Sequence, residues 1–216
     1  MNILTELEQH IIIPVVVLNN AADAAPLGDA LVAGGLPVAE VTFRTAAAAE
    51  SIKTMAERGD ILVGAGTVLT PEQVNQAVDA GARYIVSPGL SAAVVEQCRK
   101  RDVPVLPGAV TPSEIQQALE LGIKTVKFFP AGTNGGASAI KALSAPFVDV
   151  SFVPTGGVSP DNLADYLAVP AVRAVGGSWM VPGKLIEAGE FDTIIDKTAN
   201  AVELAHSLRS TTATEG

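Results

Sequence analysis

The chain has 216 residues, of which 48% are hydrophobic and 4% aromatic, and its formal net charge is −9. Alanine, valine, isoleucine and leucine supply most of the apolar content, a mixture typical of parallel strands that helices cover on both faces. A chain this acidic has no basic stripe that could follow a phosphate backbone, so we expect no nucleic-acid partner. No apolar run approaches the ~18 residues that span a bilayer, so we expect no membrane partner.

The start of the chain and its single cysteine bear on where the protein works. The segment Met1–Glu6 lacks the basic and apolar regions of a secretory signal. Cys98 has no second cysteine with which to form an internal disulfide. These features predict a cytoplasmic protein.

Apolar, β-branched runs alternate with segments of helical period along the chain. The strand candidates are Ile11–Leu18, Val38–Phe43, Ile61–Ala65, Tyr84–Val86, Val103–Leu106, Thr125–Phe129, Ser151–Val153 and Val172–Val175. The helix candidates between them are Ala21–Ala33, Ala46–Arg58, Pro71–Ala80, Ala92–Lys100, Pro112–Leu121 and Pro160–Leu167. Three helices are expected to begin at a hydroxyl residue followed by proline, because the hydroxyl caps a free N–H: Thr70-Pro71, Thr111-Pro112 and Ser159-Pro160.

This alternation predicts the fold. Repeated βα units with short connections indicate an α/β protein with a parallel sheet. About eight such units in roughly 200 residues favour a single (β/α)8 TIM barrel, with an open doubly wound sheet as the alternative. We expect one barrel domain over residues 1–206, followed by a frayed polar tail, Ser207–Gly216.

A lysine and a glutamate stand inside two of the apolar strand candidates. Lys127 shares a strand face with Phe129, and Glu40 shares one with Arg44, because strand side chains alternate. Burial favours the neutral amine of lysine, the form that attacks a carbonyl. A buried carboxylate is costly unless it is paired or used. Lys127 and Glu40 therefore form either a structural ion pair inside the barrel or a catalytic pair.

Paired glycines follow the last two strand candidates, at Gly156-Gly157 and Gly176-Gly177, and Ser178 adjoins the second pair. Backbone N–H groups in such loops bind phosphate, and the last two βα loops are the usual phosphate position in barrels. The sequence therefore predicts a phosphorylated substrate.

Residues for several other chemistries are missing from the sequence. The two histidines, His10 and His206, lie near opposite ends of the chain, and Cys98 lies in a helix candidate, so no cluster is expected to hold a catalytic zinc. There is also no P-loop and no GxGxxG motif. We expect neither a metal nor an organic cofactor.

Taken together, these segments resemble one enzyme family. The motifs that carry the resemblance are Pro14-Val15-Val16-Val17, Ala33-Gly34-Gly35, Glu40-Val41-Thr42-Phe43-Arg44-Thr45, Gly64-Ala65-Gly66-Thr67, Ser87-Pro88-Gly89, Pro107-Gly108, Lys127-Phe128-Phe129-Pro130-Ala131, Pro154-Thr155-Gly156-Gly157 and Gly176-Gly177-Ser178-Trp179. They resemble the class I 2-keto-3-deoxy-6-phosphogluconate (KDPG) aldolases, also called 4-hydroxy-2-oxoglutarate (KHG) aldolases. The likeness runs from about Ile11 to the last helix.

The resemblance implies an activity and a role for each site residue. It implies a lyase that cleaves KDPG to pyruvate and glyceraldehyde 3-phosphate, with Lys127 as the Schiff-base lysine and Glu40 as the general acid/base. Arg44 and Thr67 correspond to residues that hold the carboxylate of the keto acid. The implied pocket-lining residues are Pro88, Phe129 and Thr155, and the implied phosphate-binding residues are Gly156, Gly157, Gly177 and Ser178. The resemblance also implies a homotrimer.

Three alternatives remain open on the sequence. The first is a galacto-configured aldolase, 2-keto-3-deoxy-6-phosphogalactonate aldolase. The second is a phosphosugar isomerase or synthase, because barrels host many chemistries. The third is a phosphosugar-binding protein without turnover. The last two explain the glycine pairs but give no reason for a lysine in an apolar strand beside a buried glutamate.

Overall fold

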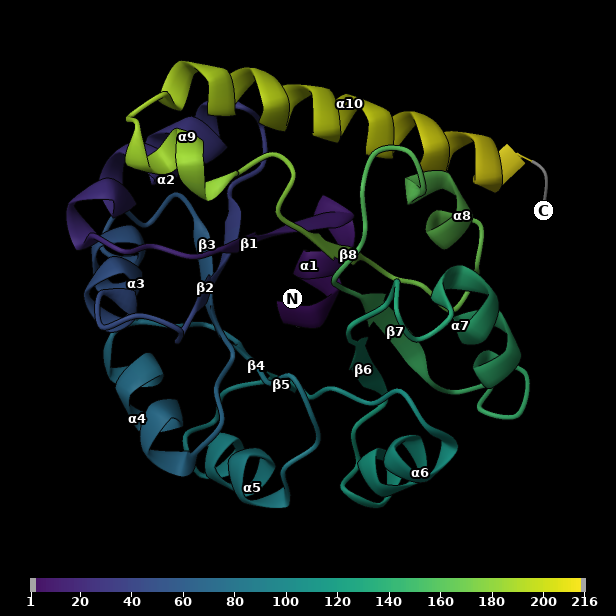
Figure 1. Cartoon of the computed structure of the whole chain (residues 1–216). Helices are drawn as coiled ribbons and strands as arrows, with labels where there is room; N and C mark the ends of the chain where they lie inside the picture. The colour runs from purple at the N-terminus through teal and green to yellow at the C-terminus, as the bar shows by residue number, and fades with distance from the viewer. Residues whose placement is uncertain (1–2, 215–216) are drawn as a thin grey trace.

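Short parallel strands follow one another around a central axis (Figure 1). The structure is a computed structural model that describes residues 3–214. In this range the strands are β1 (Ile12–Val16), β2 (Val38–Thr42), β3 (Leu62–Gly66), β4 (Ile85–Val86), β5 (Val105–Leu106), β6 (Thr125–Phe128), β7 (Ser151–Pro154) and β8 (Val175–Gly177).

The strands close into a barrel. Six of them form one sheet in the order β5-β4-β3-β2-β1-β8, and β6 pairs with β7. Parallel bridges join the two sheets, from Gly108 to Lys127 on one side and from Thr155 to Gly176 on the other. The (β/α)8 barrel predicted from the sequence is therefore confirmed, and the open doubly wound sheet is wrong.

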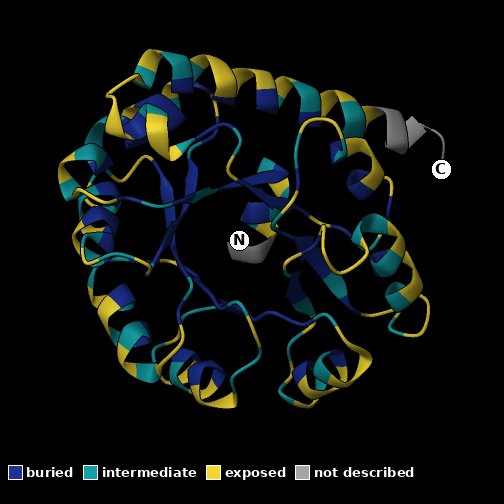
Figure 2. Cartoon of the chain, in the orientation of Figure 1, coloured by how far each residue is buried: buried dark blue, intermediate teal, exposed yellow. Residues whose placement is uncertain are grey.

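Helices cover the outside of the barrel. Their bounds are α1 (Ile3–His10), α2 (Ala24–Ala33), α3 (Ala48–Ala56), α4 (Pro71–Asp79), α5 (Ala92–Lys100), α6 (Pro112–Glu120), α7 (Gly136–Ser144), α8 (Leu163–Leu167), α9 (Gly183–Glu187) and α10 (Phe191–Thr214), with a 3-10 turn, η1, at Ala21–Asp23. Buried residues follow the strands and the inner faces of these helices (Figure 2).

Helix α1 lies at the end of the barrel where β1 begins. It directly precedes β1 and lies within the ring of strands when the barrel is viewed along its axis (Figure 1). Its Leu7 side chain is 3% exposed and joins the core. Because α1 covers the amino ends of the strands, the site is expected at their carboxyl ends, as in other barrels of this kind.

Two of the three predicted helix starts are confirmed. The Thr70 and Thr111 side chains accept the N–H groups of Gln73 and Glu114, and Glu114 completes a capping box with Thr111. The predicted start at Ser159-Pro160 is wrong, because α8 begins at Leu163. The Asn162 side chain instead accepts the Ser159 N–H and donates to Gly157 O, which holds the segment before α8 in a turn.

The last strand begins later than predicted. The β-branched run Val172–Val175 was expected to be the strand, but β8 spans Val175–Gly177 and pairs with β1 from Ile12 onward. Val172 makes only an isolated bridge to Phe152. Gly176 and Gly177 are consequently strand residues rather than loop residues.

The end of the chain also differs from the prediction of a frayed tail over Ser207–Gly216. Helix α10 continues through Thr214, and residues 215–216 lie outside the described part. The Arg209 guanidinium donates to the carbonyl oxygens of Val172 and Arg173, at 2.8 Å each. These contacts fasten the last turns of α10 to the barrel, which composition alone does not reveal.

Candidate active site

Lys127 and Glu40 meet inside the barrel. The Nζ atom of Lys127 lies 3.0 Å from Oε1 of Glu40, and the two side chains are 6% and 3% exposed. Lys127 comes from β6 and Glu40 from β2, which are not neighbours in the barrel. The pair predicted from strand alternation is therefore present, with both groups withdrawn from bulk water.

Backbone hydrogen bonds on both sides of β6 fix the position of Lys127. Its N–H donates to Pro107 O at 2.8 Å, its carbonyl accepts the Ala109 N–H at 2.9 Å, and it pairs in register with Val153 of β7. An added Cβ on Gly108 would overlap the backbone of Pro88. Close packing of the strand ends therefore links Pro88, Gly108 and Lys127.

Two glycines of β3 make room for the interior groups. Gly64 and Gly66 are paired in register with Glu40 and Thr42 of β2. A Cβ on Gly66 would overlap the carboxylate of Glu40, and a Cβ on Gly64 would overlap the ring of Tyr84. These two glycines form a groove that side chains of larger size would close.

Tyr84 is a residue of the barrel interior that sequence reasoning did not single out. It is 1% exposed, and its hydroxyl donates to Ala39 O at 2.9 Å. Burial raises the pKa of Tyr84 well above 10, and the nearby charge of Glu40 raises this pKa further. The signal that could have found it is the alternation of Gly64 and Gly66 in the neighbouring strand.

Two predicted pocket-lining residues, Phe129 and Thr155, lie at the ends of β6 and β7 with the predicted phosphate-binding residue Gly156. The ring centroid of Phe129 is 5.2 Å from Nζ of Lys127. Gly156 lies against the Phe129 ring, and Thr155 is 5% exposed and packs against Gly176. The structure therefore brings together the carboxyl ends of β6, β7 and β8 beside the amine.

The predicted phosphate-binding residues follow β7 and β8. Gly156 and Gly157 have φ values of 86° and 81°, the left-handed region that favours glycine. Asn162 holds this loop by donating to Gly157 O at 2.8 Å. Gly177 is the last residue of β8, packed against Trp179, and Ser178 is exposed directly after it. One glycine pair thus forms an open loop, and the other allows close packing within the barrel.

The remaining predicted residues follow the strand ends, and within residues 3–214 none of them forms a hydrogen bond or ion pair with Lys127 or Glu40. Arg44 follows β2 and is exposed, without an ion-pair partner among residues 3–214. Thr67 follows β3, is half-buried and has a φ of 57°. Pro88 follows β4 and is half-buried. All three follow the carboxyl ends of their strands.

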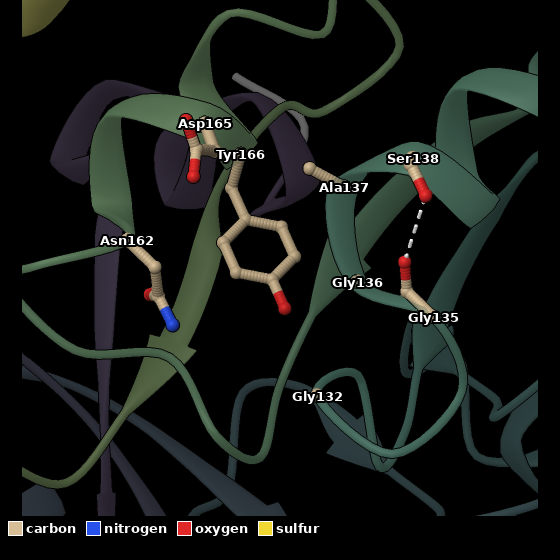
Figure 3. A pocket seen from close by; sticks show the side chains of 8 residues that line it. All are labelled: Gly132, Gly135, Gly136, Ala137, Ser138, Asn162, Asp165 and Tyr166. Carbon is tan, nitrogen blue, oxygen red and sulfur yellow. Dashed lines mark hydrogen bonds between the residues drawn. The ribbon is translucent and has the colours of Figure 1, made fainter.

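A separate open pocket of about 600 Å³ lies between α7 and α8, outside the barrel (Figure 3). It is lined by Gly132, Gly135, Gly136, Ala137, Ser138, Asn162, Asp165 and Tyr166. Tyr166 points its hydroxyl toward Gly136, 3.5 Å from where a Cβ there would lie. Neither Lys127 nor Glu40 lines this pocket, which adjoins the Gly156-Gly157 loop through Asn162.

The described part of the chain offers neither a metal-binding cluster nor a membrane-spanning helix. No group of three or more His, Cys, Asp or Glu residues in it could hold a metal ion. None of its helices has the length and apolarity to cross a membrane.

Burial raises the pKa of the Cys98 thiol to about 12, which keeps this residue protonated and unreactive.

Comparison with known proteins decides the family. The model of the KDPG and KHG aldolase family matches residues 3–197, most of the chain. The chain belongs to the KDPG and KHG aldolase family.

Individual members of the family are similar to this chain over nearly their whole length. A 2-dehydro-3-deoxy-phosphogluconate aldolase of Treponema pallidum is 50% identical over 195 residues, 90% of this chain and 93% of that protein. A KHG/KDPG aldolase of Escherichia coli K12 is 44% identical, with 89% and 91% covered. A KDPG aldolase of Legionella pneumophila, solved with pyruvate captured as a covalent carbinolamine, is 38% identical with a TM-score of 0.89, covering 93% and 98%.

Proposed function

We propose that this chain is a class I aldolase that reversibly cleaves KDPG to pyruvate and glyceraldehyde 3-phosphate through a Schiff base on Lys127. The observation that carries the proposal is the 3.0 Å contact between the buried Lys127 amine and the Glu40 carboxylate. An ammonium and a carboxylate in this position can exchange a proton directly, which makes the neutral, nucleophilic amine available. Membership of the KDPG and KHG aldolase family supports the same chemistry.

The first half of the reaction builds the electron sink. Lys127 transfers a proton to Glu40, and the neutral amine attacks the C2 ketone to give a carbinolamine. Glu40 returns the proton to the departing hydroxyl, water leaves, and an iminium remains. In the Legionella relative, pyruvate was captured as a covalent carbinolamine, the intermediate that this step requires.

The second half breaks the carbon–carbon bond. Glu40, acting through a water, accepts the C4 hydroxyl proton while the C3–C4 bond breaks and its electrons flow into the iminium. Glyceraldehyde 3-phosphate departs, and pyruvate is left as an enamine on Lys127. Protonation at C3 and addition of water then release pyruvate and restore the amine. Burial of the pair supports this sequence, because few water molecules can intercept the enamine.

Residues at the carboxyl ends of the strands are proposed to orient the substrate. Arg44 and Thr67 bind its carboxylate, which gives the exposed Arg44 guanidinium a partner. Pro88, Phe129 and Thr155 line the reacting carbons. Gly156, Gly157, Gly177 and Ser178 bind the phosphate, and the positive φ values of Gly156 and Gly157 fit a turn whose backbone N–H groups bind an anion.

Substrate choice is the finer part of the proposal. Cleavage of 4-hydroxy-2-oxoglutarate to pyruvate and glyoxylate is proposed as a second activity, since a 44% identical relative carries the name KHG/KDPG aldolase. The gluco configuration is preferred over galacto because the Treponema relative named for the gluco acid is 50% identical. The open glycine loop favours KDPG, which carries a phosphate, over 4-hydroxy-2-oxoglutarate, which carries none.

The function is tested by measuring pyruvate release from KDPG by wild-type and Lys127→Met chains. Methionine has a similar length and no amine, so we expect turnover to be abolished. Lys124→Met is the matched control, because Lys124 is exposed just before the same strand. Full turnover by Lys127→Met would instead favour a phosphosugar isomerase or synthase on this barrel.

Two further properties complete the proposal. Cleavage is independent of metal and organic cofactors, so turnover should persist after dialysis against a chelator. The protein is a cytoplasmic homotrimer, as the family resemblance implies. Sedimentation equilibrium should then give about three times the 22.0 kDa of one chain, and a stable monomer with full activity would contradict the trimer.

A further inference from the structure

We propose that Tyr84 is a positioning residue for Glu40, and that Gly64 exists to admit its ring. This inference rests on the proposed function, in which Glu40 moves protons. It concerns a hydroxyl that belongs to none of the substrate-binding groups above. Tyr84 lies directly before β4, and Glu40 lies in the middle of β2, with β3 between them.

The hydroxyl of Tyr84 is attached to the peptide that carries Glu40. It donates to the carbonyl oxygen of Ala39 at 2.9 Å, and this carbonyl belongs to the peptide group whose nitrogen is that of Glu40. The pKa of Tyr84 is raised by burial and by Glu40, so the phenol stays protonated and remains a donor throughout the working range of pH. The hydrogen bond is therefore kept at every working pH, and it holds the backbone from which the Glu40 side chain projects.

The groove of β3 holds the ring and the carboxylate side by side. The ring of Tyr84 occupies the space of a Cβ on Gly64, and the carboxylate of Glu40 occupies that of a Cβ on Gly66. Both glycines point into the barrel, since they are two residues apart on one strand. With the ring filling the groove beside Gly64, the carboxylate has no room to fall toward the amino end of the barrel.

Glu40 needs this support during turnover. Among residues 3–214, Lys127 is the one group that donates a hydrogen bond to its carboxylate. Schiff-base formation converts the Lys127 ammonium into an iminium with a single N–H, so this contact changes when Glu40 must accept a proton. The glycine groove and the hydrogen bond from Tyr84 to Ala39 O do not change in this step. They hold the carboxylate where the proton is transferred.

The test uses the full chain with Tyr84→Phe, which keeps the ring and removes the hydroxyl. Two partial reactions separate positioning from folding: the final yield of borohydride trapping with pyruvate, and the rate at which pyruvate methyl hydrogens exchange with D2O, followed by NMR. The final trapping yield depends on a folded site with Lys127, because reduction is irreversible, whereas the exchange rate depends on Glu40 taking a methyl proton. Tyr166→Phe is the matched control, because Tyr166 is the other tyrosine of the chain and lines the pocket outside the barrel.

We expect Tyr84→Phe to lower kcat and the methyl exchange rate by about tenfold. We expect KM to stay within about twofold, because ground-state binding is unchanged, and trapping to reach the wild-type final yield. Gly64→Ala, which forces the ring out of the groove, should give the same selective loss. Unchanged exchange in Tyr84→Phe, or an equal loss of trapping and exchange, would overturn the positioning role. A wild-type chain that traps no pyruvate would overturn the proposed function first.

Discussion

Glu40 and Lys127 are 87 positions apart in the sequence, yet their side chains meet at 3.0 Å in the interior of the barrel. Removing two charges from water costs several kcal/mol per ion, so a buried pair of this kind is weak as a source of stability. The groove at Gly66 shows that β3 is shaped around the Glu40 carboxylate. A fold shaped around a costly buried pair is what the proposed catalytic role of Lys127 and Glu40 predicts.

Replacing Glu40 by glutamine tests the division of labour within the pair. Glutamine keeps the size of the side chain but cannot accept a proton, so we expect kcat to fall by about 10²–10⁴-fold. The Lys127 side chain is unchanged in this variant, so borohydride trapping with pyruvate should still reach a full adduct after long incubation. Initial rates and adduct formation measure the two effects. Glu50→Gln, at an exposed position of α3, is the control, and full activity of Glu40→Gln would contradict the assignment.

Adding one methyl group to β3 tests the groove. In Gly66→Ala the new Cβ overlaps Oε1 of Glu40, so the carboxylate has to move away from Lys127. A displacement of about 1 Å at a catalytic group costs on the order of 10²-fold in rate. Gly183→Ala is the matched control, since no atom lies within 4 Å of a Cβ placed there. Equal turnover of the two variants would show that the groove is irrelevant to catalysis.

Inorganic phosphate should inhibit cleavage competitively at millimolar concentration, because it occupies the loop at Gly156-Gly157 and Ser178. Ser178→Ala removes one donor and should raise the inhibition constant. The measurement is the slope of reciprocal rate plots at several phosphate concentrations, with sodium chloride added to equalise ionic strength. A change of the intercept alone, or no effect of phosphate, would contradict binding in this loop.

A buried hydroxyl in α10 offers a test of stability that leaves the site unchanged. Among the described residues, Oγ1 of Thr198 is the one buried side-chain polar atom without a hydrogen-bond partner, and Thr198 packs against Gly34 after α2. Thr198→Val keeps the shape and removes the unpaired hydroxyl, so we expect a gain of about 1 kcal/mol in the free energy of unfolding. Thr198→Ser keeps the hydroxyl and loses the methyl, so it should be less stable than wild type. Urea denaturation measures the free energy of unfolding of both variants. A valine variant less stable than wild type would show that the Thr198 hydroxyl has a hydrogen-bond partner in solution.

The architecture was predictable because its determinants are local. The two-residue alternation of side chains in β2 and β6 was enough to predict that Glu40 and Lys127 face the barrel interior. Cap residues such as Thr111 marked helix starts through a bond that spans only three residues. The family resemblance identified the same strand-end residues, and the family model confirmed the family.

The rest depended on contacts between distant segments. In the sequence, Tyr84 is only the first residue of an apolar strand candidate. The structure shows that its hydroxyl donates a hydrogen bond to Ala39 O, 45 positions away. The late start of β8 follows from its register with Ile12 of β1, although the β-branched run begins at Val172. The helical end of α10 is fastened by Arg209 to a loop 36 positions earlier. Composition and periodicity carry no record of these pairings.

The most direct test of the Schiff-base proposal is borohydride reduction in the presence of pyruvate, followed by intact mass and peptide mapping. We expect one reduced pyruvyl group per chain, located on Lys127, and no adduct on the exposed Lys124 of the same segment. A folded protein that gains no pyruvyl group, or gains it on another lysine, would contradict the proposed mechanism.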